Sequence, residues 1–421
     1  MHSGGDVLYD VAILGGGASG MFAAAVAAAR GARVVIIDKN KTLGEKLAIT
    51  GGGRCNITNA EYDIHALLKN YGTDAKFLYS PFSQFGVKDT FKYFSARGLP
   101  LVVEARQRAF PETQRATDVV KVLEKELKKH KVTIVRSTIK RIVGDGTTIT
   151  SVETAGGSIR AQAYILATGG ASHQETGSTG DGFKFLKSIG HTVKDPTPTI
   201  VPLAVRDRWI KILAGVSLKK VAIAFYLDEK KQFSKSGDIL CTHFGLSGPT
   251  ILNSARMVGD LLEGGGAVTA RIDAHPTLDL GALEKRVITV FDANKNKTLK
   301  TVFKELCPEG SAKGVQTLLT NINFETKVHS VSRDDRKKIV RLLKALPVQI
   351  QGLMGYDRAV VADGGVPLSE IDTRTMGSLK FDNLFVTGDL LHINRPSGGY
   401  SLQLCWTTGF VAGTAASLIK T

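Results

Sequence analysis

Tyr9–Asp38 reads YDVAILGGGASGMFAAAVAAARGARVVIID. An apolar run is followed by a glycine turn at 15–20, an alanine-rich run that ends at Arg30 and a second apolar run that ends at Asp38. This order is typical of strand, tight turn, helix and strand, because alanine favours helix and is small enough to let the helix pack closely on a sheet. The sequence therefore predicts a βαβ unit at the start of the chain.

Three glycines of this unit have the GxGxxG spacing of a dinucleotide-binding turn, namely Gly15, Gly17 and Gly20. The first permits the tight turn, the second lets a pyrophosphate approach the backbone, and the third allows close packing of the helix. Asp38 ends the second strand, where a carboxylate accepts both ribose hydroxyls and disfavours the 2′-phosphate of NADP. The pattern predicts FAD or NAD.

Two later segments favour FAD over NAD. Ile165–Gly170 reads ILATGG and Leu384–Asp389 reads LFVTGD, so each is an apolar strand that runs into a Thr-Gly turn. In large flavoproteins such turns lie at the carboxyl ends of sheet strands around the cofactor, and Asp389 is expected to bind a ribityl hydroxyl. No second GxGxxG follows a strand, so any NAD(P)H is expected to bind transiently, as a reductant.

Composition limits the class of protein. The chain has 421 residues, of which 43% are apolar and 22% charged, as in a folded soluble protein of more than one domain. Its net charge is +16, and residues 281–345 alone carry 14 basic and 7 acidic side chains. Ribosomal or transfer RNA is therefore one candidate partner, and a well-solvated surface is the plain alternative.

The four cysteines lie far apart in the sequence, and no segment reads as a signal peptide or a membrane span. We therefore expect a protein of the reducing cytoplasm that has no membrane partner. The sequence leaves the oligomeric state open.

The middle of the chain departs from βαβ alternation. Strand-like segments at 201–205, 219–226 and 268–272 predict an inserted β-rich domain, and periodic apolar residues within 281–345 predict helices. Short alternating segments between 139 and 163 predict a small antiparallel meander. The predicted fold class is α/β: a Rossmann-like FAD-binding domain with an inserted β-barrel and a nested helical subdomain. The predicted domains are 1–194 with 355–421 for FAD, 195–280 with 346–354 for the β-rich insert, and 281–345 for the helices.

Two glycine-rich segments are candidates for contact with the flavin. GGGRCN at 51–56 could converge backbone N–H groups on an anion, with Arg54 adding a positive charge. Cys55 has no second cysteine nearby, so packing or cofactor contact is favoured over a redox role. PSGGYS at 396–401 leads into an apolar helix, whose N-terminus would stabilise negative charge on a reduced flavin.

Candidates for acid–base chemistry are fewer. His243, His392 and Tyr400 lie on or near glycine-rich turns, where any of them could protonate a substrate as general acid. No metal is expected, because the sequence has no HxH, HxxxH or Cys-His cluster.

Five further blocks carry a family resemblance, namely GEKLAITGGGRCNITN at 44–59, CTHFGLSGPTIL at 241–252, AVVADGGV at 359–366, DTRTMGS at 372–378 and VTGDLLHINRPSGGYSLQLCWTTGFVAG at 386–413. Together they resemble the signature blocks of the YhiN/BaiN-like flavoproteins, often labelled aminoacetone-oxidase-type FAD-binding enzymes, and the resemblance spans nearly the whole chain. It implies an FAD domain built from both chain ends, an inserted β-barrel and a helical subdomain.

Motifs and resemblance together give the expected cofactor contacts: Gly15, Gly17, Ala18, Ser19, Gly20, Asp38, Lys39, Lys46, Gly52, Gly53, Arg54, Cys55, Asn56, Val135, Ala167, Thr168, Gly169, Gly388, Asp389, Gly398, Gly399, Tyr400 and Ser401. We expect non-covalent FAD and hydride transfer between flavin N5 and an activated C=C or amino-carbonyl substrate. The alternatives are an RNA-directed enzyme that reduces uridine to dihydrouridine, a flavin-dependent oxidase of a small aminoketone such as aminoacetone, and a flavin-binding protein without turnover.

Overall fold

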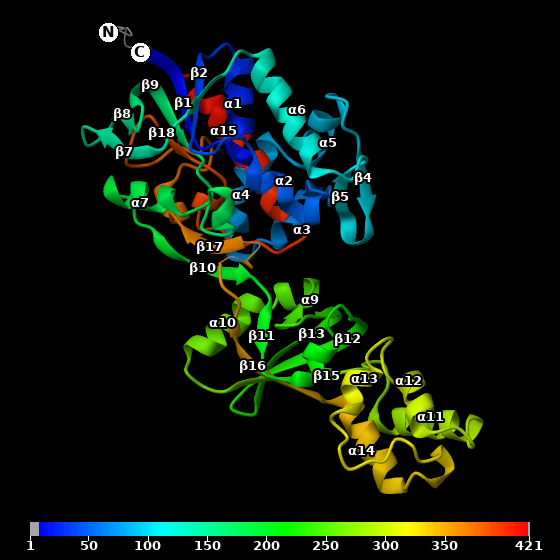
Figure 1. Ribbon diagram of the computed structural model, residues 1–421. Coiled ribbons are helices and arrows are strands. Elements are labelled where there is room, and N and C mark those ends of the chain that lie inside the picture. The colour runs from blue at the N-terminus through cyan, green and yellow to red at the C-terminus, as the bar shows by residue number, and fades with distance from the viewer. Residues whose placement is uncertain (1–7, 357, 360, 420–421) are drawn as a thin grey trace. The chain divides into compact units, whose positions relative to one another are not determined.

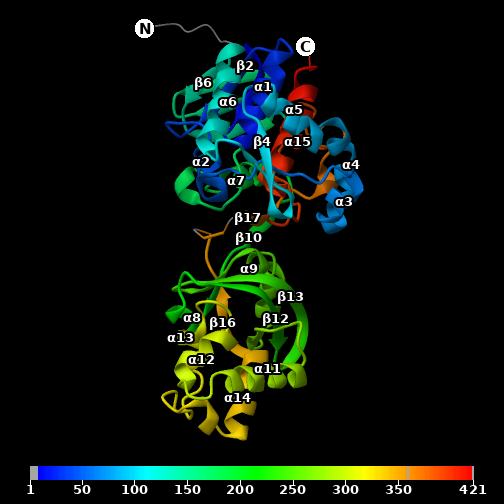
Figure 2. The same ribbon diagram turned by 90° about the vertical axis from the view of Figure 1, so that its right-hand side faces the viewer.

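The computed structural model divides the chain into two compact units (Figures 1 and 2). It describes residues 8–356, 358–359 and 361–419. The first unit combines Met1–Thr197 with Val361–Thr421, and the inserted unit is Pro198–Val360. Both chain ends thus contribute to one unit, as expected for a discontinuous nucleotide-binding domain.

The strands of the first unit are β1 Leu8–Leu14, β2 Val34–Asp38, β3 Thr58–Asn59, β4 Leu101–Glu104, β5 Arg108–Pro111, β6 Thr133–Arg136, β7 Ile139–Gly144, β8 Ile149–Thr154, β9 Gly157–Leu166, β10 Lys194–Ile200, which runs on into the inserted unit, β17 Val361–Gly365 and β18 Leu384–Val386. Its α-helices are α1 Ala18–Ala29, α2 Glu45–Ile49, α3 Ile64–Lys69, α4 Ala75–Gln84, α5 Val87–Ser95, α6 Ala116–Lys129, α7 Asp181–Ser188 and α15 Tyr400–Ala416.

The strands of the inserted unit are β11 Leu203–Val205, β12 Ser217–Leu227, β13 Lys230–Cys241, β14 Gly245–Ser247, β15 Val268–Asp273 and β16 Leu346–Leu353. Its α-helices are α8 Arg208–Ile212, α9 Pro249–Leu252, α10 Ala255–Glu263, α11 Leu280–Ala293, α12 Leu299–Leu306, α13 Ala312–Gln316 and α14 Arg333–Lys344.

A parallel sheet in the order β6-β2-β1-β9 forms the centre of the first unit, and β18 pairs with β9 in parallel. Ile13 of β1 lies opposite Ile36 of β2 and Ile165 of β9, and all three side chains are fully buried. Such continuous apolar strands are typical of a parallel sheet covered on both faces. The predicted antiparallel meander is confirmed, and its third strand is the amino end of β9 itself, so the meander extends the main sheet.

Helices α1 and α15 pack against each other at very close range (Figure 1). A Cβ added at Gly409 would lie 2.8 Å from Ser19 O, and one added at Gly413 would lie 2.5 Å from Ala23 O. The alanines of α1 and the glycines of α15 therefore allow the two helices to approach each other closely. The last helix of the chain thereby buries the first.

The inserted unit contains a closed barrel of strands in the order β11-β14-β13-β12-β15-β16. Its neighbouring strands are antiparallel, so the predicted inserted β-barrel is confirmed.

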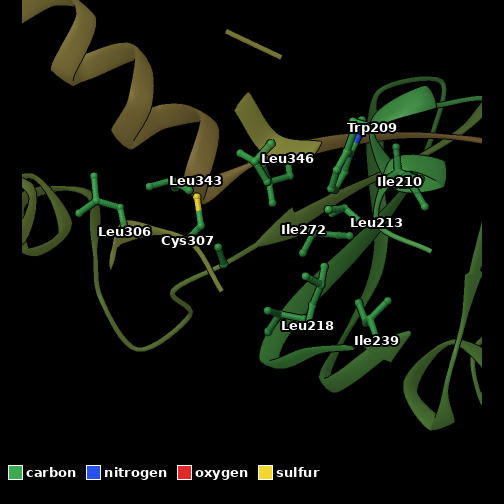
Figure 3. Close-up of a cluster of buried hydrophobic side chains, with 14 of the residues drawn as sticks. Trp209, Ile210, Leu213, Leu218, Ile239, Ile272, Leu306, Cys307, Leu343 and Leu346 are labelled. Atoms are coloured by element: carbon green, nitrogen blue, oxygen red, sulfur yellow. The ribbon is translucent and has the colours of Figure 1, made fainter. Parts of the chain in front are cut away.

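Helices α11 to α14 share one hydrophobic cluster with the barrel. Figure 3 shows Leu306 and Leu343 from the helices in the same buried cluster as Ile272 from the barrel. The predicted nested helical subdomain is present, but it is built onto the barrel core rather than around a core of its own. Across the described ranges, no helix combines the length and the apolar character needed to cross a bilayer.

Candidate functional site

The GxGxxG turn joins β1 to α1 with the geometry that its spacing predicts. Gly15 has a φ of 107°, and a Cβ added there would lie 2.6 Å from Ala167 O at the end of β9. A Cβ on Gly20 would overlap the carbonyl oxygen of Gly15. Among the described residues, by contrast, no atom lies within 4 Å of a Cβ built on Gly17. Gly15 and Gly20 are thus required for packing, whereas Gly17 leaves open space of the kind a pyrophosphate needs.

Asp38 is fixed against this turn by two backbone donors. Its Oδ2 accepts from Gly16 N at 2.5 Å, and its Oδ1 accepts from Asn40 N at 2.7 Å. Each carboxylate oxygen retains a second lone pair. The side chain is therefore held in place and can still accept ribose hydroxyls.

A pocket opens beside the turn, at the carboxyl ends of β1, β2 and β9. Its lining residues are Gly15, Gly16, Gly17, Ile37, Asp38, Lys39, Asn40, Gly44, Glu45, Lys46, Ser137, Thr138, Ile139, Ala167, Thr168, Thr176, Gly177, Ser178, Thr179, Asp181 and Phe185. All of them belong to the first unit. A pocket at this edge of an open α/β sheet is where such folds bind their ligands.

The loop from 176 to 181 closes the far wall of the pocket. Lys39 Nζ donates to Thr179 Oγ1 and Asp181 Oδ2, both at 2.7 Å, and Asn40 Nδ2 donates to Thr176 O at 2.9 Å. This wall was not predicted from the sequence, and Thr179 lies 140 positions after Lys39. A signal was present, because Thr179-Gly180-Asp181 repeats the Thr-Gly-Asp triplet at 387–389.

Lys46 connects the pocket to the second Thr-Gly turn. Its Nζ donates to Ser172 Oγ at 2.6 Å and lies 3.5 Å from Asp389 Oδ2. Asp389 Oδ1 accepts from Arg395 Nη2 at 2.6 Å. Burial opposes the ionisation of Asp389, but the charges of Arg395 and Lys46 hold its pKa below the ordinary value. Lys46 and Asp389 were predicted from the sequence, whereas Arg395 was not singled out, although it lies within the block at 386–413.

The turn after β18 lies against the first turn of α1. Gly388 has a φ of 62°, and its N–H donates to Thr408 Oγ1 of α15 at 3.1 Å. Thr387 Oγ1 donates to Ser19 Oγ at 3.2 Å, although the two residues are 368 positions apart in the sequence. Segments from the two ends of the chain are thus brought to one end of the sheet.

The glycine loop before β3 does not line this pocket. Gly52 and Gly53 are exposed and have left-handed φ values of 68° and 84°. The Arg54 guanidinium pairs with Glu104, donates to Gln114 Oε1 at 2.7 Å and lies 4.2 Å from the centre of the Phe110 ring. The positive charge of Arg54 is therefore engaged by a neighbouring carboxylate, and its predicted cofactor contact stays a prediction.

Cys55 is fully buried beside this loop, and burial raises the pKa of its thiol to about 12. A thiol held protonated at neutral pH is a poor nucleophile. This supports a packing role.

The N-terminus of α15 is anchored by side chains from the β3 segment. The side-chain oxygen of Asn56 accepts from Gly399 N at 3.0 Å, and its side-chain nitrogen donates to Thr58 O. Asn59 Nδ2 donates to Gly398 O at 3.2 Å. The first N–H groups of a helix have no partner within the helix, so this anchoring holds a set of backbone donors in a fixed direction.

Gln403 fixes the first turn of α15 from inside. Its Oε1 accepts from Thr58 Oγ1 at 2.7 Å and from Thr90 Oγ1 at 2.9 Å. The carbonyl oxygen of Tyr400 accepts from Tyr71 Oη at 2.9 Å. The predicted helix N-terminus is thus a rigid element.

The three predicted acid–base residues do not lie in one unit. Tyr400 and His392 belong to the first unit, whereas His243 is an exposed residue on the turn between β13 and β14 of the inserted unit. Tyr400 is 9% exposed, and burial, together with Glu61, raises its pKa. The backbone N–H of His392 donates to Val366 O at 2.9 Å. Their catalytic roles stay predictions.

The remaining predicted contacts surround the same end of the first unit. Ala18, Ser19 and Gly20 form the first turn of α1. Val135 lies on β6, two residues before Ser137, which lines the pocket. Thr168 lines the pocket, and its Oγ1 is buried without a hydrogen-bond partner among the described residues. Gly169 has a φ of 74°, and Ser401 lies in the first turn of α15.

A flavin dinucleotide fits this set of residues. Gly17 leaves open space at the turn, and Asp38 presents carboxylate lone pairs. Thr168 lines the pocket and has a buried hydroxyl without a hydrogen-bond partner among the described residues. No group of three or more His, Cys, Asp or Glu side chains could hold a metal ion in the part of the chain that the structure describes. Fold and site define the class of Rossmann-type dinucleotide-binding flavoproteins.

Comparison with known proteins agrees. The model of the HI0933-like protein Rossmann domain matches residues 9–415. The 3-dehydro-bile acid delta(4,6)-reductase of Clostridium scindens is 30% identical over 415 residues, which cover 97% of this chain and 98% of the relative. The ribosomal RNA dihydrouridine synthase of Escherichia coli is 28% identical over 408 residues and 96% of each chain. A flavocytochrome c3 fumarate reductase has the same fold, with a TM-score of 0.55 at 17% identity over 99% of this chain and 79% of its own.

The chain belongs to the HI0933-like family of FAD-dependent flavoproteins, and the predicted resemblance to YhiN/BaiN-like proteins is confirmed. It is accordingly a flavin-dependent oxidoreductase.

Proposed function

We propose that this chain reduces a carbon–carbon double bond that is conjugated to a carbonyl group. The observation that carries the proposal is the chemistry shared by two full-length relatives of different substrate class. The delta-4 and delta-6 double bonds conjugated to a 3-oxo group, and the 5,6 bond of uracil, are all alkenes activated by a carbonyl. Members of the family would then share one reaction and differ in their substrates.

Residues of the first unit would hold the cofactor for this reaction. Gly17 and the α1 N-terminus suit the pyrophosphate, Asp38 the adenosine ribose, and Asp389 the ribityl chain. Bound FAD would supply the hydride. The fixed N-terminus of α15 would stabilise negative charge that develops during reduction.

Addition of hydrogen across a double bond also needs a proton. We infer that Tyr400 is the best candidate donor, because its phenol carries a transferable proton and stands at the first position of α15, the helix end expected to face the flavin. His392 and His243 remain predicted alternatives. Replacement of Tyr400 by Phe should lower turnover and leave the flavin spectrum unchanged.

We infer that FAD is bound non-covalently and that NAD(P)H delivers the two electrons. The buried thiol of Cys55 has a pKa raised to about 12, which does not favour attachment to the flavin. Heat-denatured protein should release intact FAD, and NADH or NADPH should bleach the bound flavin under anaerobic conditions. A flavin-binding protein without turnover would resist bleaching.

RNA is the substrate class that the charge favours. The net charge of +16 attracts polyanions, and Lys338 and Arg341 are exposed on α14. Lys344, the last residue of α14, does not add to that surface. Its Nζ lies 2.6 Å from Asp273 Oδ2 and donates to the carbonyl oxygen of Leu278 at 2.5 Å, so its charge is used inside the unit.

The test combines deletion of the gene with assays of the purified enzyme on candidate substrates. Deletion of the gene should remove at least one dihydrouridine from ribosomal or transfer RNA, and purified enzyme with NAD(P)H should restore it. If every dihydrouridine persists while a steroid-like enone is reduced, the RNA class fails and the reaction class stands. If neither is reduced but aminoacetone drives oxygen uptake, the proposed reduction is wrong.

A further inference from the structure

A buried cation lies in the loop that connects β18 to α15. The side chain of Arg395 is 1% exposed. Its Nη1 donates to Ile393 O at 2.7 Å and its Nη2 to Asp389 Oδ1 at 2.6 Å. A guanidinium loses its hydration when it is buried, and one well-formed pair repays this only in part. Burial of Arg395 therefore costs folding free energy. A charge with this cost is retained mainly where it has a further role.

The contact with Asp389 divides the two oxygens of that carboxylate. Oδ1 is taken by Arg395, while Oδ2 faces Lys46 Nζ at 3.5 Å. Lys46 lines the cofactor pocket. Because Arg395 also donates to Ile393 O, its guanidinium is held from two sides and fixes the direction of its hydrogen bond to Asp389. The orientation of Asp389 toward Lys46, which lines the pocket, thus depends on Arg395.

Arg395 also closes its own loop. Its two donors reach back to Ile393 and Asp389, which lie two and six residues earlier. The same loop begins at the turn after β18 and leads to Gly399, the N-cap of α15. One side chain therefore fixes the connection between two elements that are expected to face the flavin.

We propose that Arg395 is a positioning residue for the cofactor, which orients the Asp389 carboxylate toward the Lys46 side of the pocket without itself touching the cofactor. This goes beyond the proposed function, because it concerns how FAD is held whatever the substrate.

The surrounding charges predict a pH signature. Asp389 faces Arg395, Lys46 and the thiol of Cys405 on α15, and Arg395 also interacts with Asp363 on β17 and the phenol of Tyr71. Burial favours the neutral form of Asp389, and the two cations oppose it. Loss of Arg395 removes one of the two cations that oppose the effect of burial, so the pKa of Asp389 should rise and protonation should begin at a higher pH than in the parent.

The experiment measures the FAD dissociation constant of reconstituted apoprotein at pH 8 and pH 5.5. Arg395→Met should weaken binding roughly 10- to 100-fold, the value of one hydrogen bond between charged groups, and the loss should be larger at pH 5.5. Asp389→Asn should weaken binding equally at both values. The Arg395→Met/Asp389→Asn double variant should bind no worse than Asp389→Asn, because the arginine acts through the carboxylate.

Arg97→Met is the matched control, since Arg97 pairs with Glu126 at 2.9 Å in the same unit and does not line the pocket. It should lower the melting temperature of the apoprotein and leave FAD affinity unchanged. If Arg395→Met does not fold, Arg395→Lys carries the test: the charge is kept and the fork is lost, so affinity should fall without the added loss at pH 5.5. Unchanged affinity in both Arg395 variants, or additive losses in the double variant, would overturn the proposal.

Discussion

The two units of this protein differ in whether charged residues are buried. Within its described part, the first unit buries four residues of the acidic, basic and histidine types, namely Glu126, His191, Asp363 and Arg395. Among the described residues of Pro198–Val360, no side chain of these types is buried. Buried charges are costly and are retained mainly at sites that use them, whereas surface charges attract partners over a distance. Of the four, Glu126 pairs with Arg97 away from the pocket, whereas Arg395 pairs with Asp389 beside Lys46 of the pocket. The first unit thus keeps charge inside its fold, and the described part of the inserted unit presents its charge at the surface.

The units also differ in how their cores are closed. The first needs both chain ends, because β18 and α15 complete a sheet and a helix pair that β1 and α1 begin. The inserted unit is continuous in sequence and closes its barrel with its own six strands. Each unit thus has the contacts expected of an independently folding body.

Removal of the inserted unit is the most drastic test of this comparison. Strands β10 and β17 pair, and a Cβ on Gly364 would lie 2.5 Å from Pro196 Cα, so a short linker can replace 198–360. The remaining protein should fold and bind FAD, because the whole pocket lining lies in the first unit. We expect complete loss of turnover with RNA or enone, measured beside a normal flavin spectrum.

A colourless but folded product of this deletion would break the comparison, since the inserted unit would then be needed for the cofactor. The isolated inserted unit serves as the partner experiment and should melt cooperatively without flavin.

Replacement of Gly17 by Val should separate cofactor binding from folding within the first unit. The new side chain meets no described atom at its Cβ but occupies the open space at the turn, so FAD affinity should fall roughly 100-fold. Circular dichroism and the melting temperature of the apoprotein should stay near those of the parent. Gly20→Val is the contrast, because its Cβ overlaps Gly15 O and folding itself should fail. Full FAD occupancy in Gly17→Val would show that the turn is not the nucleotide site.

Neutralisation of cations on α14 should weaken RNA binding and leave the cofactor site of the first unit unchanged. Changing the half-buried Lys337 and the exposed Lys338 and Arg341 to Gln should lower the slope of log affinity against log salt by about 2 to 3. Each cation would otherwise neutralise about one phosphate, although Asp335 already pairs with Lys338 at 2.9 Å. FAD content and flavin reduction by dithionite should not change. Lys344→Gln should instead destabilise the inserted unit by about 2 kcal/mol, because its hydrogen bonds lie inside the unit. An unaltered salt slope in the triple variant would remove α14 from the RNA surface.

The smallest effect concerns acid stability of the first unit. Burial opposes ionisation of Glu370, but hydrogen bonds from Thr192, Lys380 and His191 lower its pKa from 4.5 to about 2. A carboxyl group with a depressed pKa stabilises the fold above its ordinary pKa, and this contribution is lost as the pH falls from 4.5 to 2.

Glu370→Gln should therefore cost about 2 kcal/mol of unfolding free energy at pH 7 and nothing below pH 2. Urea unfolding of the variant between pH 5 and pH 2 should show a flatter pH dependence than the parent. Equal slopes in parent and variant would show that Glu370 carries no pH-linked stability.

Much of the fold could be predicted from local sequence. The run from Tyr9 to Asp38 carries a complete βαβ unit, because strand, turn and helix propensities there agree with one another. The strands of the insert and the helices of 281–345 follow from apolar periodicity in the same way. The helices' shared core with the barrel could not be predicted, since periodicity shows which face is apolar and not what covers it.

Prediction of the site was less complete. The residues with special backbone needs were found, among them Gly15, Gly17 and Gly388, because glycine marks its own conformation. The pairing of Arg54 with Glu104 and the inward turn of Lys344 were not foreseen, since a charged side chain carries no local sign of its partner.

By itself, then, the sequence determined the turn that approaches the cofactor, because that turn depends on residues close together in the chain. The cofactor class followed from two Thr-Gly turns that recur after apolar strands, and the insertion of a second unit between two halves of the first followed from the family resemblance. The tertiary structure alone decided that residues 176–181 wall the pocket and that Arg395 is buried against Asp389. It also decided that α15 closes on α1. Such contacts join distant segments through packing and ion pairing, and no local pattern encodes which segments will meet.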